Sequence, residues 1–230
     1  MIDFHSHILP KMDDGSQSTQ ESLEMLQALS EQGVTRVVAT PHFYANDESV
    51  SAFLERRKSS YDRLISCVTP DMPEIINGAE VRYYGGISHL ENLEALCVKG
   101  SRLILLEMPE NRWTEYAIRE IEDVSSERNL IPVLAHIERY IAYQNSETLY
   151  RLLESGVLMQ INASFLNGFF SRRKALNMLK RNQIHFIGSD CHNMSDRPPE
   201  IQKAVKIIRK KLGDGFTDSF VDFANIFLKI

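Results

Sequence analysis

Cysteine is scarce in this chain, which holds only Cys67, Cys97 and Cys191 among its 230 residues. The number is odd, and no two of the three are spaced as metal-binding or redox pairs are. The sequence therefore excludes a disulfide framework and a thiolate metal site. It indicates a protein of a reducing compartment, and we expect a cytoplasmic location.

Long apolar runs are also missing. No stretch approaches the roughly 18 residues that a membrane-spanning helix requires. The first residues do not form the basic segment and apolar segment of a signal peptide. The net charge is −5, and basic residues form no stripe along the sequence. We therefore expect no membrane insertion and no nucleic acid as a main partner.

What is present is an ordinary globular composition, with 43% hydrophobic and 25% charged residues. The length suits one domain, residues 1–230, with a single core. Short apolar stretches alternate with amphipathic ones. The expected strands are residues 2–5, 35–39, 74–80, 103–108, 131–135, 158–162 and 184–188. The expected helices lie between Ser18 and Gly33 and at residues 51–68, 114–128, 146–155, 171–181, 201–212 and 217–228, while residues 82–101 combine loop and a short helix.

Apolar strands that alternate with helices build a parallel sheet covered on both faces. Seven such strands indicate an α/β fold with a closed or nearly closed barrel. Barrels and sheets of this kind bind ligands beyond the carboxyl ends of their strands. The ends of the strands are therefore where a functional site is expected.

Metal-capable side chains follow nearly every expected strand. Residues two apart on an extended chain point the same way, so His5 and His7 direct both imidazoles at one place. The turn after them carries Asp13 and Asp14. The later strand ends carry His42, Glu80, Glu107, His136, Asp190 and His192. A purely structural role does not require so many buried ionisable groups, so we expect a metal site.

Five histidines with Asp14, Glu80, Glu107 and Asp190 are too many ligands for one ion, and they suit two or three. Nitrogen and oxygen donors without thiolate favour Mn, Fe or Zn. Three divalent ions, four carboxylates and a bridging hydroxide would leave a charge near +1, which attracts an anion. Such a site generates hydroxide near neutral pH and stabilises charge on a phosphoryl group.

Two arginines stand beside the expected ligands in the sequence. Arg139 follows His136, and Arg197 follows His192. A guanidinium can hold two phosphate oxygens at once, so both are candidate phosphate-binding and catalytic residues. The alternative for each is a surface ion pair with the adjacent Glu138 or Asp196.

Six segments together resemble the PHP (polymerase and histidinol phosphatase) superfamily. They are Ile2-Asp-Phe-His-Ser-His7, Asp13-Asp-Gly15, Thr40-Pro-His42, Gly78-Ala-Glu80, Ala135-His-Ile-Glu-Arg-Tyr140 and Gly188-Ser-Asp-Cys-His-Asn193. Within it, the chain is most similar to the bacterial manganese-dependent tyrosine phosphatases of capsule and exopolysaccharide synthesis (the CpsB/YwqE-like family). The match runs in order through nearly the whole chain.

The resemblance implies a distorted TIM-like (β/α)7 barrel with three metal ions, manganese first and iron or zinc as alternatives. It implies phosphate binding by Arg139 and Arg197, and it selects Asp14 over Asp13. The implied metal ligands are His5, His7, Asp14, His42, Glu80, Glu107, His136, Asp190 and His192. The implied partner is the phosphotyrosine tail of a bacterial tyrosine kinase that controls polysaccharide export. Whether the chain forms a homo-oligomer is left open.

We interpret the chain as a phosphomonoesterase in which a metal-bound hydroxide attacks phosphorus in line. Phenol, with a pKa near 10, leaves without a strong general acid, and no histidine beyond the ligands stands near the site, so phosphotyrosine is the expected substrate. Three alternatives stay open: a small-molecule phosphatase of the histidinol phosphate kind, an amidohydrolase, which usually needs a bridging lysine, and a regulator that binds phosphotyrosine without turnover.

Cys191 and Arg197 have the C-x5-R spacing of cysteine-dependent tyrosine phosphatases. That mechanism requires a loop of backbone N–H groups around phosphate and a thiol of lowered pKa. No glycine lies between the two residues, and Asp190 beside the sulfur would raise the pKa of the thiol. We therefore expect Cys191 to have no catalytic role.

Overall fold

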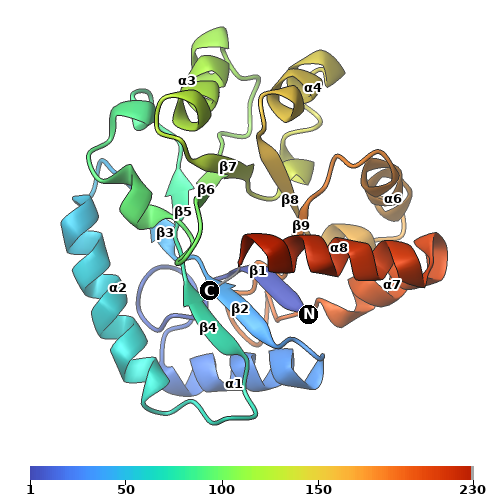
Figure 1. The fold of residues 1–230 in the computed structure, drawn as a ribbon. Helices are drawn as coiled ribbons and strands as arrows, with labels where there is room; N and C mark the ends of the chain where they lie inside the picture. Colours follow the sequence, from blue (N-terminus) through green and yellow to red (C-terminus); the bar gives the residue numbers. More distant parts are fainter. Residues whose placement is uncertain (229–230) are drawn as a thin grey trace.

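The computed structural model describes residues 1–228, and its strands are all parallel. The strands are β1 (Ile2–Ser6), β2 (Arg36–Ala39), β3 (His42–Phe43), β4 (Glu74–Asn77), β5 (Glu80–Arg82), β6 (Leu103–Glu107), β7 (Ile131–Leu134), β8 (Leu158–Asn162) and β9 (Phe186–Gly188). They form two sheets, one in the order β1-β2-β4 and one in the order β3-β5-β6-β7-β8-β9. Figure 1 shows the strands curling around a common centre with the helices outside.

Backbone hydrogen bonds join the two sheets into the expected distorted barrel. On one side Asp190 N donates to His5 O at 2.8 Å and His7 N donates to Cys191 O at 2.9 Å. On the other side the chain runs directly from β2 into β3 and from β4 into β5, and across the junction Gly78 N donates to Ala39 O and Glu80 N donates to Pro41 O. The sequence prediction of an α/β barrel is therefore confirmed.

The expected strand at residues 74–80 is wrong in one respect, because it is two strands. β4 ends at Asn77, paired with Ala39, and β5 begins at Glu80, paired with His42. The two neighbouring segments of the chain both leave the strand conformation at the same level of the sheet, at Thr40–Pro41 and at Gly78–Ala79. Proline has no N–H for the ladder, which gives a physical reason for the break. The break creates β3, which the sequence did not predict as a strand.

The helices lie where amphipathic segments were expected, with ends shifted by a few residues. They are α1 (Thr19–Glu31), α2 (Val50–Ile65), α3 (Glu115–Ser126), α4 (Ser146–Glu154), α5 (Ala163–Asn167), α6 (Arg172–Lys180), α7 (Gln202–Leu212) and α8 (Asp214–Phe227), with the short 3-10 turns η1 (Ile87–His89), η2 (Leu93–Leu96) and η3 (Ile137–Arg139). Ser18 caps α1 as predicted, since its hydroxyl accepts from Glu21 N. The short α5 was not predicted. None of the helices in residues 1–228 has the length and apolar character to cross a membrane.

The alternation of β6 shows how the fold positions the site. Leu103 and Leu105 belong to the cluster inside the barrel, whereas Ile104 and Leu106 belong to the cluster beneath the helices. Glu107 continues the inward series at the carboxyl end of the strand. Helix α8 packs onto the interior cluster through Ala224 and lies across the barrel in Figure 1.

Candidate metal centre

The two histidines of the first segment meet as their spacing predicts. His5 lies in β1 and His7 just beyond its end, and both are fully buried. Their Nε2 atoms are 3.1 Å apart. Ligand atoms about 2.1 Å from one ion, at tetrahedral or octahedral angles, are about 3.0 to 3.4 Å apart. The spacing of the two nitrogens fits a shared ion.

Glu80 lies at the middle of the histidines. Its Oε2 atom is 3.2 Å from His5 Nε2, 3.4 Å from His7 Nε2 and 3.0 Å from His42 Nδ1. Its Oε1 atom is 2.8 Å from His136 Nε2. Within residues 1–228, His42 Nδ1 is buried and has no hydrogen bond of normal geometry, as a nitrogen reserved for a cation would be. A carboxylate among four imidazoles would be able to hold ions together with them.

Asp190 divides its two oxygens between two environments. Oδ1 faces the histidines, at 3.6 Å from His5 Nε2 and 3.5 Å from His7 Nε2. Oδ2 accepts from Arg139 Nη2 at 2.9 Å and lies 2.6 Å from Arg197 Nη2. One carboxylate therefore joins the imidazole cluster to the two guanidinium groups.

The structure brings eight of the nine predicted ligands together in three groups of donor atoms. The groups are His7, Asp14, His42 and His192, then His5, His7 and Asp190, and last His42, Glu80 and Glu107. His7 and His42 each belong to two groups. His136 belongs to none of the three and joins the site through Glu80. The Asp14 side chain is 66% exposed, with Oδ1 3.4 Å from His192 Nε2.

Oxygen acceptors behind the imidazoles orient the ring nitrogens. His7 Nδ1 is 2.8 Å from Asp13 Oδ2, His192 Nδ1 is 3.0 Å from Asp190 O, and His5 Nδ1 is 3.3 Å from Gln160 Oε1. Each contact favours the tautomer with its hydrogen on Nδ1, which leaves Nε2 free to bind a metal. The donor set therefore fits divalent cations.

Sequence reasoning missed two of these supports. Asp13 was passed over in favour of Asp14, yet it also accepts from the backbone of His42 and of Gly15. Gln160 is fully buried in β8 and accepts from His136 N at 2.6 Å. A glutamine in an otherwise apolar strand is a signal that could have identified it, since buried polar groups need partners.

Unusual backbone conformations hold two of the predicted ligands. His136 has φ 30° and Asp190 has φ 53°, both in the left-handed region that costs a non-glycine residue energy. Two glycines permit close approach behind the histidines. A Cβ on Gly15 would lie 2.3 Å from His7 O, and one on Gly188 would lie 2.5 Å from His5 Cβ. The strained residues and the closely packed glycines thus lie where the candidate ligands converge.

The charges of the centre depend strongly on one another. Burial raises the pKa of Glu80, but the histidines His5, His136 and His42 together lower it by more than burial raises it. The carboxyl therefore titrates well below its usual range. Burial lowers the pKa of His7, but Asp13 and Glu80 raise it well above its ordinary value. Burial lowers the pKa of His192 to about 4. Since metal ligands must be deprotonated, cations and protons compete for these groups.

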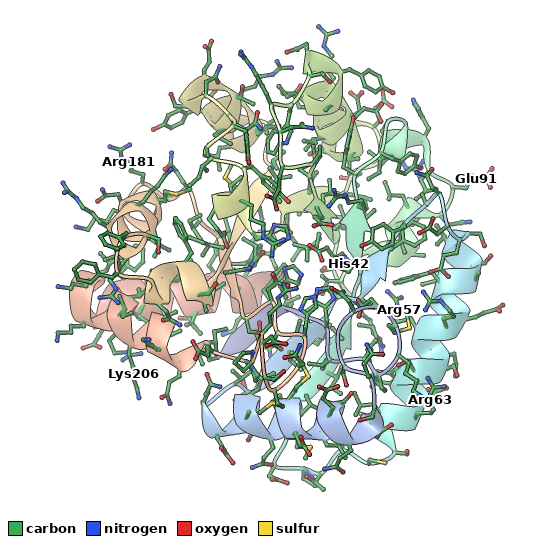
Figure 2. The ribbon with its side chains drawn as sticks, turned by 180° about the vertical axis from the view of Figure 1, so that it is seen from behind. His42, Arg57, Arg63, Glu91, Arg181 and Lys206 are labelled. Atoms are coloured by element: carbon green, nitrogen blue, oxygen red, sulfur yellow. The ribbon has the colours of Figure 1, made fainter. Side chains whose placement is uncertain are left out.

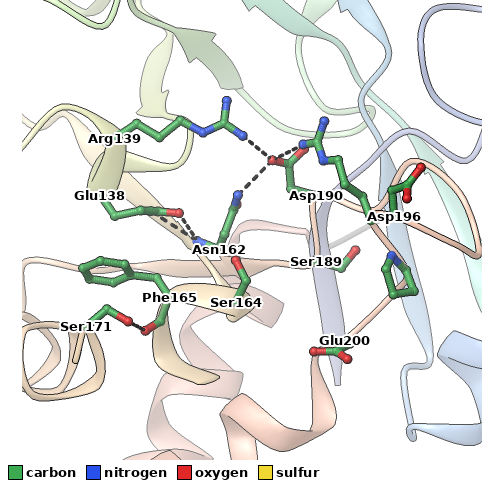
Figure 3. Close-up of a pocket in the computed structure, with 12 residues that line it drawn as sticks. Glu138, Arg139, Asn162, Ser164, Phe165, Ser171, Ser189, Asp190, Asp196 and Glu200 are labelled. Atoms are coloured by element: carbon green, nitrogen blue, oxygen red, sulfur yellow. Dashed lines mark hydrogen bonds and ion pairs between the residues drawn. The ribbon is translucent and has the colours of Figure 1, made fainter. Parts of the chain in front are cut away.

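A pocket of about 580 Å³ opens beside Asp190. Figure 3 shows Arg139 and Asn162 pointing to Asp190 from two different segments. Arg197, from a third segment, lies with Nη2 2.6 Å from Asp190 Oδ2. The surface ion pairs with Glu138 and Asp196 that were considered as alternatives do not occur within residues 1–228, where Arg139 pairs with Glu107 and Asp190, and Arg197 pairs with Asp190. Glu138 instead faces Asn162 N at 3.2 Å, and burial raises its pKa to about 8.

Cys191 lies away from this pocket. Its side chain is fully buried in the hydrophobic core. Burial, and after it the charges of Asp3 and Asp190, raise the pKa of its thiol far above the ordinary value. A buried neutral thiol is a poor nucleophile. This geometry agrees with the sequence prediction that Cys191 has no catalytic role, despite its C-x5-R spacing to Arg197.

The chain is similar to known proteins along nearly its whole length. A family model described as "Capsular polysaccharide synthesis, CpsB/CapC" matches residues 1–226. The tyrosine-protein phosphatase YwqE of Bacillus subtilis (strain 168) is 33% identical over 239 residues, which cover 100% of this chain and 92% of that protein.

Two solved structures are also similar. One comes from crystal structures of YwqE and of CpsB from Streptococcus pneumoniae, described as unique metal-dependent tyrosine phosphatases. It has a TM-score of 0.85 and 30% identity, covering 99% of this chain and 94% of that one. Histidinol phosphate phosphatase from Lactococcus lactis, solved with zinc, L-histidinol and phosphate, has a TM-score of 0.55 at 16% identity and covers 93% of this chain and 94% of its own. The second likeness concerns the fold alone.

Proposed function

The chain belongs to the CpsB/CapC family of capsular polysaccharide synthesis, and from this we propose that it is a metal-dependent protein-tyrosine phosphatase. It is thus a phosphoric monoester hydrolase, as the motifs of the sequence predict. The observation that carries the proposal is Asp190, whose one oxygen faces the donor cluster while the other faces two arginines. A phosphoryl group in the pocket beside it would meet both.

We infer that the centre holds two to three divalent ions, with manganese as first candidate and iron or zinc as alternatives. When bound, such ions lower the pKa of coordinated water and stabilise negative charge on a phosphoryl group. The side chains proposed to hold them are His5, His7, Asp14, His42, Glu80, Glu107, His136, Asp190 and His192.

The two arginines and Asn162 are the chain's own means of binding the phosphoryl group. Arg139 and Arg197 approach Asp190 from different segments, so a phosphate between them would accept from both guanidinium groups. Positive charge already fixed in position needs no reorganisation as charge develops in the transition state. We propose these two residues as catalytic.

One residue of the pocket bears on the expected preference for phosphotyrosine. The two histidines that are not proposed as ligands are indeed elsewhere, with His89 exposed in η1 and His185 beside Phe223. However, Glu138 lines the pocket, and burial raises the pKa of its carboxyl to about 8. A protonated carboxyl could assist an alkoxide, so the absence of a free histidine does not by itself exclude alkyl phosphates.

We further propose that the physiological substrate is the phosphotyrosine tail of a bacterial tyrosine kinase that controls capsule or exopolysaccharide synthesis. The test compares kcat/KM for a phosphotyrosine peptide, a phosphoserine peptide and histidinol phosphate on one manganese-loaded preparation. We expect the phosphotyrosine peptide to be preferred by at least tenfold. Preference for histidinol phosphate by tenfold would replace the proposal with the small-molecule alternative. Binding of phosphotyrosine without turnover of any of the three would indicate a regulator.

A further inference from the structure

Two neighbouring phenylalanines lie almost completely in solvent on the loop between α5 and α6. Phe169 is 82% exposed and Phe170 is 92% exposed. Their rings meet edge to face, with centroids 5.2 Å apart. Contiguous exposed apolar surface of this kind marks interaction sites, unlike apolar residues scattered singly. The exposure of this pair therefore points to a partner.

A groove of about 360 Å³ begins at Phe169 and runs between α6 and α7. Leu176 of α6 and Leu212 of α7 supply its apolar part. Four cations supply its charge, the exposed Lys180 and Lys211 together with Arg172 and Arg173. A groove with an aromatic end, an apolar base and cationic edges suits an extended chain that carries negative charge.

The groove belongs to a basic face that only the fold assembles. Residues 172–181 and 202–212 each contain five lysines or arginines and no aspartate or glutamate. Figure 2 shows Arg181 and Lys206 on the same side of the molecule, away from His42 at the centre. Among the described residues of these two segments, Arg209 is the one cation in an ion pair, with Asp214 and Asp218. The positive charge of this face is otherwise uncompensated, although the whole chain carries −5.

The basic face is continuous with the candidate active site. Phe165 and Ser171 line the pocket beside Asp190, while Phe169 and Arg172 line the groove. The loop between them is held in place, since Arg172 donates to the carbonyl oxygens of Leu166 and Asn167. A peptide with its phosphotyrosine in the pocket would reach the groove across this one loop.

We propose that the groove between α6 and α7, with Phe169 and Phe170, docks an acidic segment flanking the phosphotyrosine of the protein substrate. The inference rests on the proposed function and names the specificity of the same site. A peptide is favoured over an anionic membrane because the groove is concave and shares a loop with the active-site pocket. Charge complementarity would lower KM and leave the chemical step unchanged.

The test uses the full-length, manganese-loaded protein and two phosphotyrosine peptides that differ in acidic or neutral flanks. The groove variant is Lys180→Glu with Lys211→Glu. The control is Arg63→Glu with Lys99→Glu, which makes the same change of charge at exposed positions elsewhere. We expect the groove variant to raise KM for the acidic peptide at least tenfold. The control should change it less than twofold, and kcat for p-nitrophenyl phosphate should stay unchanged in both variants.

Added salt should raise KM for the acidic peptide in the wild type and have little effect in the groove variant. Phe169→Ser with Phe170→Ser should raise KM for both peptides. Equal KM values in the groove and control variants would overturn the proposal. The proposal would also be overturned if the groove variant lost binding to phosphatidylserine vesicles while its KM for the acidic peptide stayed unchanged. That result would assign the basic face to lipid binding.

A separate binding measurement distinguishes failure of the docking proposal from failure of the proposed function. Fluorescence anisotropy of an acidic peptide without phosphotyrosine reports on the groove whether or not the protein turns over phosphotyrosine. Weaker binding to the groove variant than to the control supports docking even if histidinol phosphate is the preferred substrate. Equal binding to both variants overturns docking even if phosphotyrosine is hydrolysed.

Discussion

At the scale of the residue, Asp190 explains the site best. Its left-handed backbone, at φ 53°, turns the carboxylate so that one oxygen meets imidazoles and the other meets guanidinium groups. Asn162 Nδ2 also donates to the second oxygen, at 2.8 Å. With three nitrogen donors around its second oxygen, the carboxylate keeps a single orientation. Strained backbone conformations of this kind are typical of functional sites, where a side chain must be held in one direction to bind its ligand.

Loss of either arginine should therefore reduce catalysis without removing metal. Arg139→Ala and Arg197→Ala are each expected to lose about 2–4 kcal/mol of transition-state stabilisation. This loss corresponds to a decrease in kcat/KM of about 30-fold to 1000-fold. Steady-state kinetics should be paired with elemental analysis of bound metal. Unchanged kinetics in both variants would show that the arginines only pair with Asp190.

Cys191→Ser gives the opposite expectation. Because the thiol is buried and its pKa is raised, the variant should keep phosphatase activity within a few-fold of the wild type. Alkylating reagents should likewise have little effect on the native enzyme. A loss of several orders of magnitude with metal content unchanged would assign the nucleophile to the cysteine.

At the scale of the element, β9 combines a structural end and a functional end. His185 precedes the strand, accepts from Met159 N through Nδ1 at 3.0 Å and packs near Phe223. Gly188 ends the strand in contact with His5. Burial lowers the pKa of His185 to about 4, so the imidazole stays neutral in the folded protein. Protonation of this residue therefore opposes folding.

The pH dependence follows from this pKa. The unfolded chain, with a histidine pKa near 6.5, binds the proton more readily than the folded chain between about pH 6.5 and pH 4. The stability that the folded protein gains from a neutral His185 is therefore fully present above about pH 6.5 and is lost as pH falls from there to about 4. In metal-free protein, going from pH 7 to pH 5.5 should reduce the free energy of unfolding by about 1 kcal/mol more in wild type than in His185→Gln. Denaturant unfolding at both pH values measures this, and parallel curves would contradict it.

At the scale of the whole molecule, the candidate metal centre connects most of the barrel. Its side chains come from β1, β3, β5 and β6 and from the segments after β1, β7 and β9. An ion held by several of these elements binds the folded state and not the unfolded one. Metal occupancy and stability are then linked.

Chelation should consequently destabilise the protein as well as abolish its activity. At a manganese concentration about 100 times the dissociation constant, binding adds about 2.7 kcal/mol, which for a chain of this size corresponds to a rise in Tm of about 5–11 °C. Calorimetry with chelator and with manganese measures the difference. Asp190→Asn serves as the control, because a weakened ligand should reduce the increment. Equal Tm values under the two conditions, with activity retained in chelator, would contradict a metal centre.

Local physics made much of this molecule predictable from the sequence. Apolar strands, amphipathic helices and side-chain caps such as Ser18, Ser49 and Thr114 depend on neighbours within a few residues. The parallel topology also places every strand end at one rim. Eight of the nine candidate ligands could therefore be named without coordinates, because each stands at or just beyond the end of an expected strand. The family resemblance selected the ninth, Asp14, on the turn after the first strand.

What only the tertiary structure decided depends on residues far apart in the chain. Gln160 supports His5 across 155 positions, and the basic face joins two helices whose charges are diluted along the sequence. The break of β4 and β5 needs its partner break at Pro41, and the burial of Cys191 needs the packed core around it. Sequence periodicity reports which side of an element is buried, but not which distant atom will meet it there. That pairing is determined when the barrel closes.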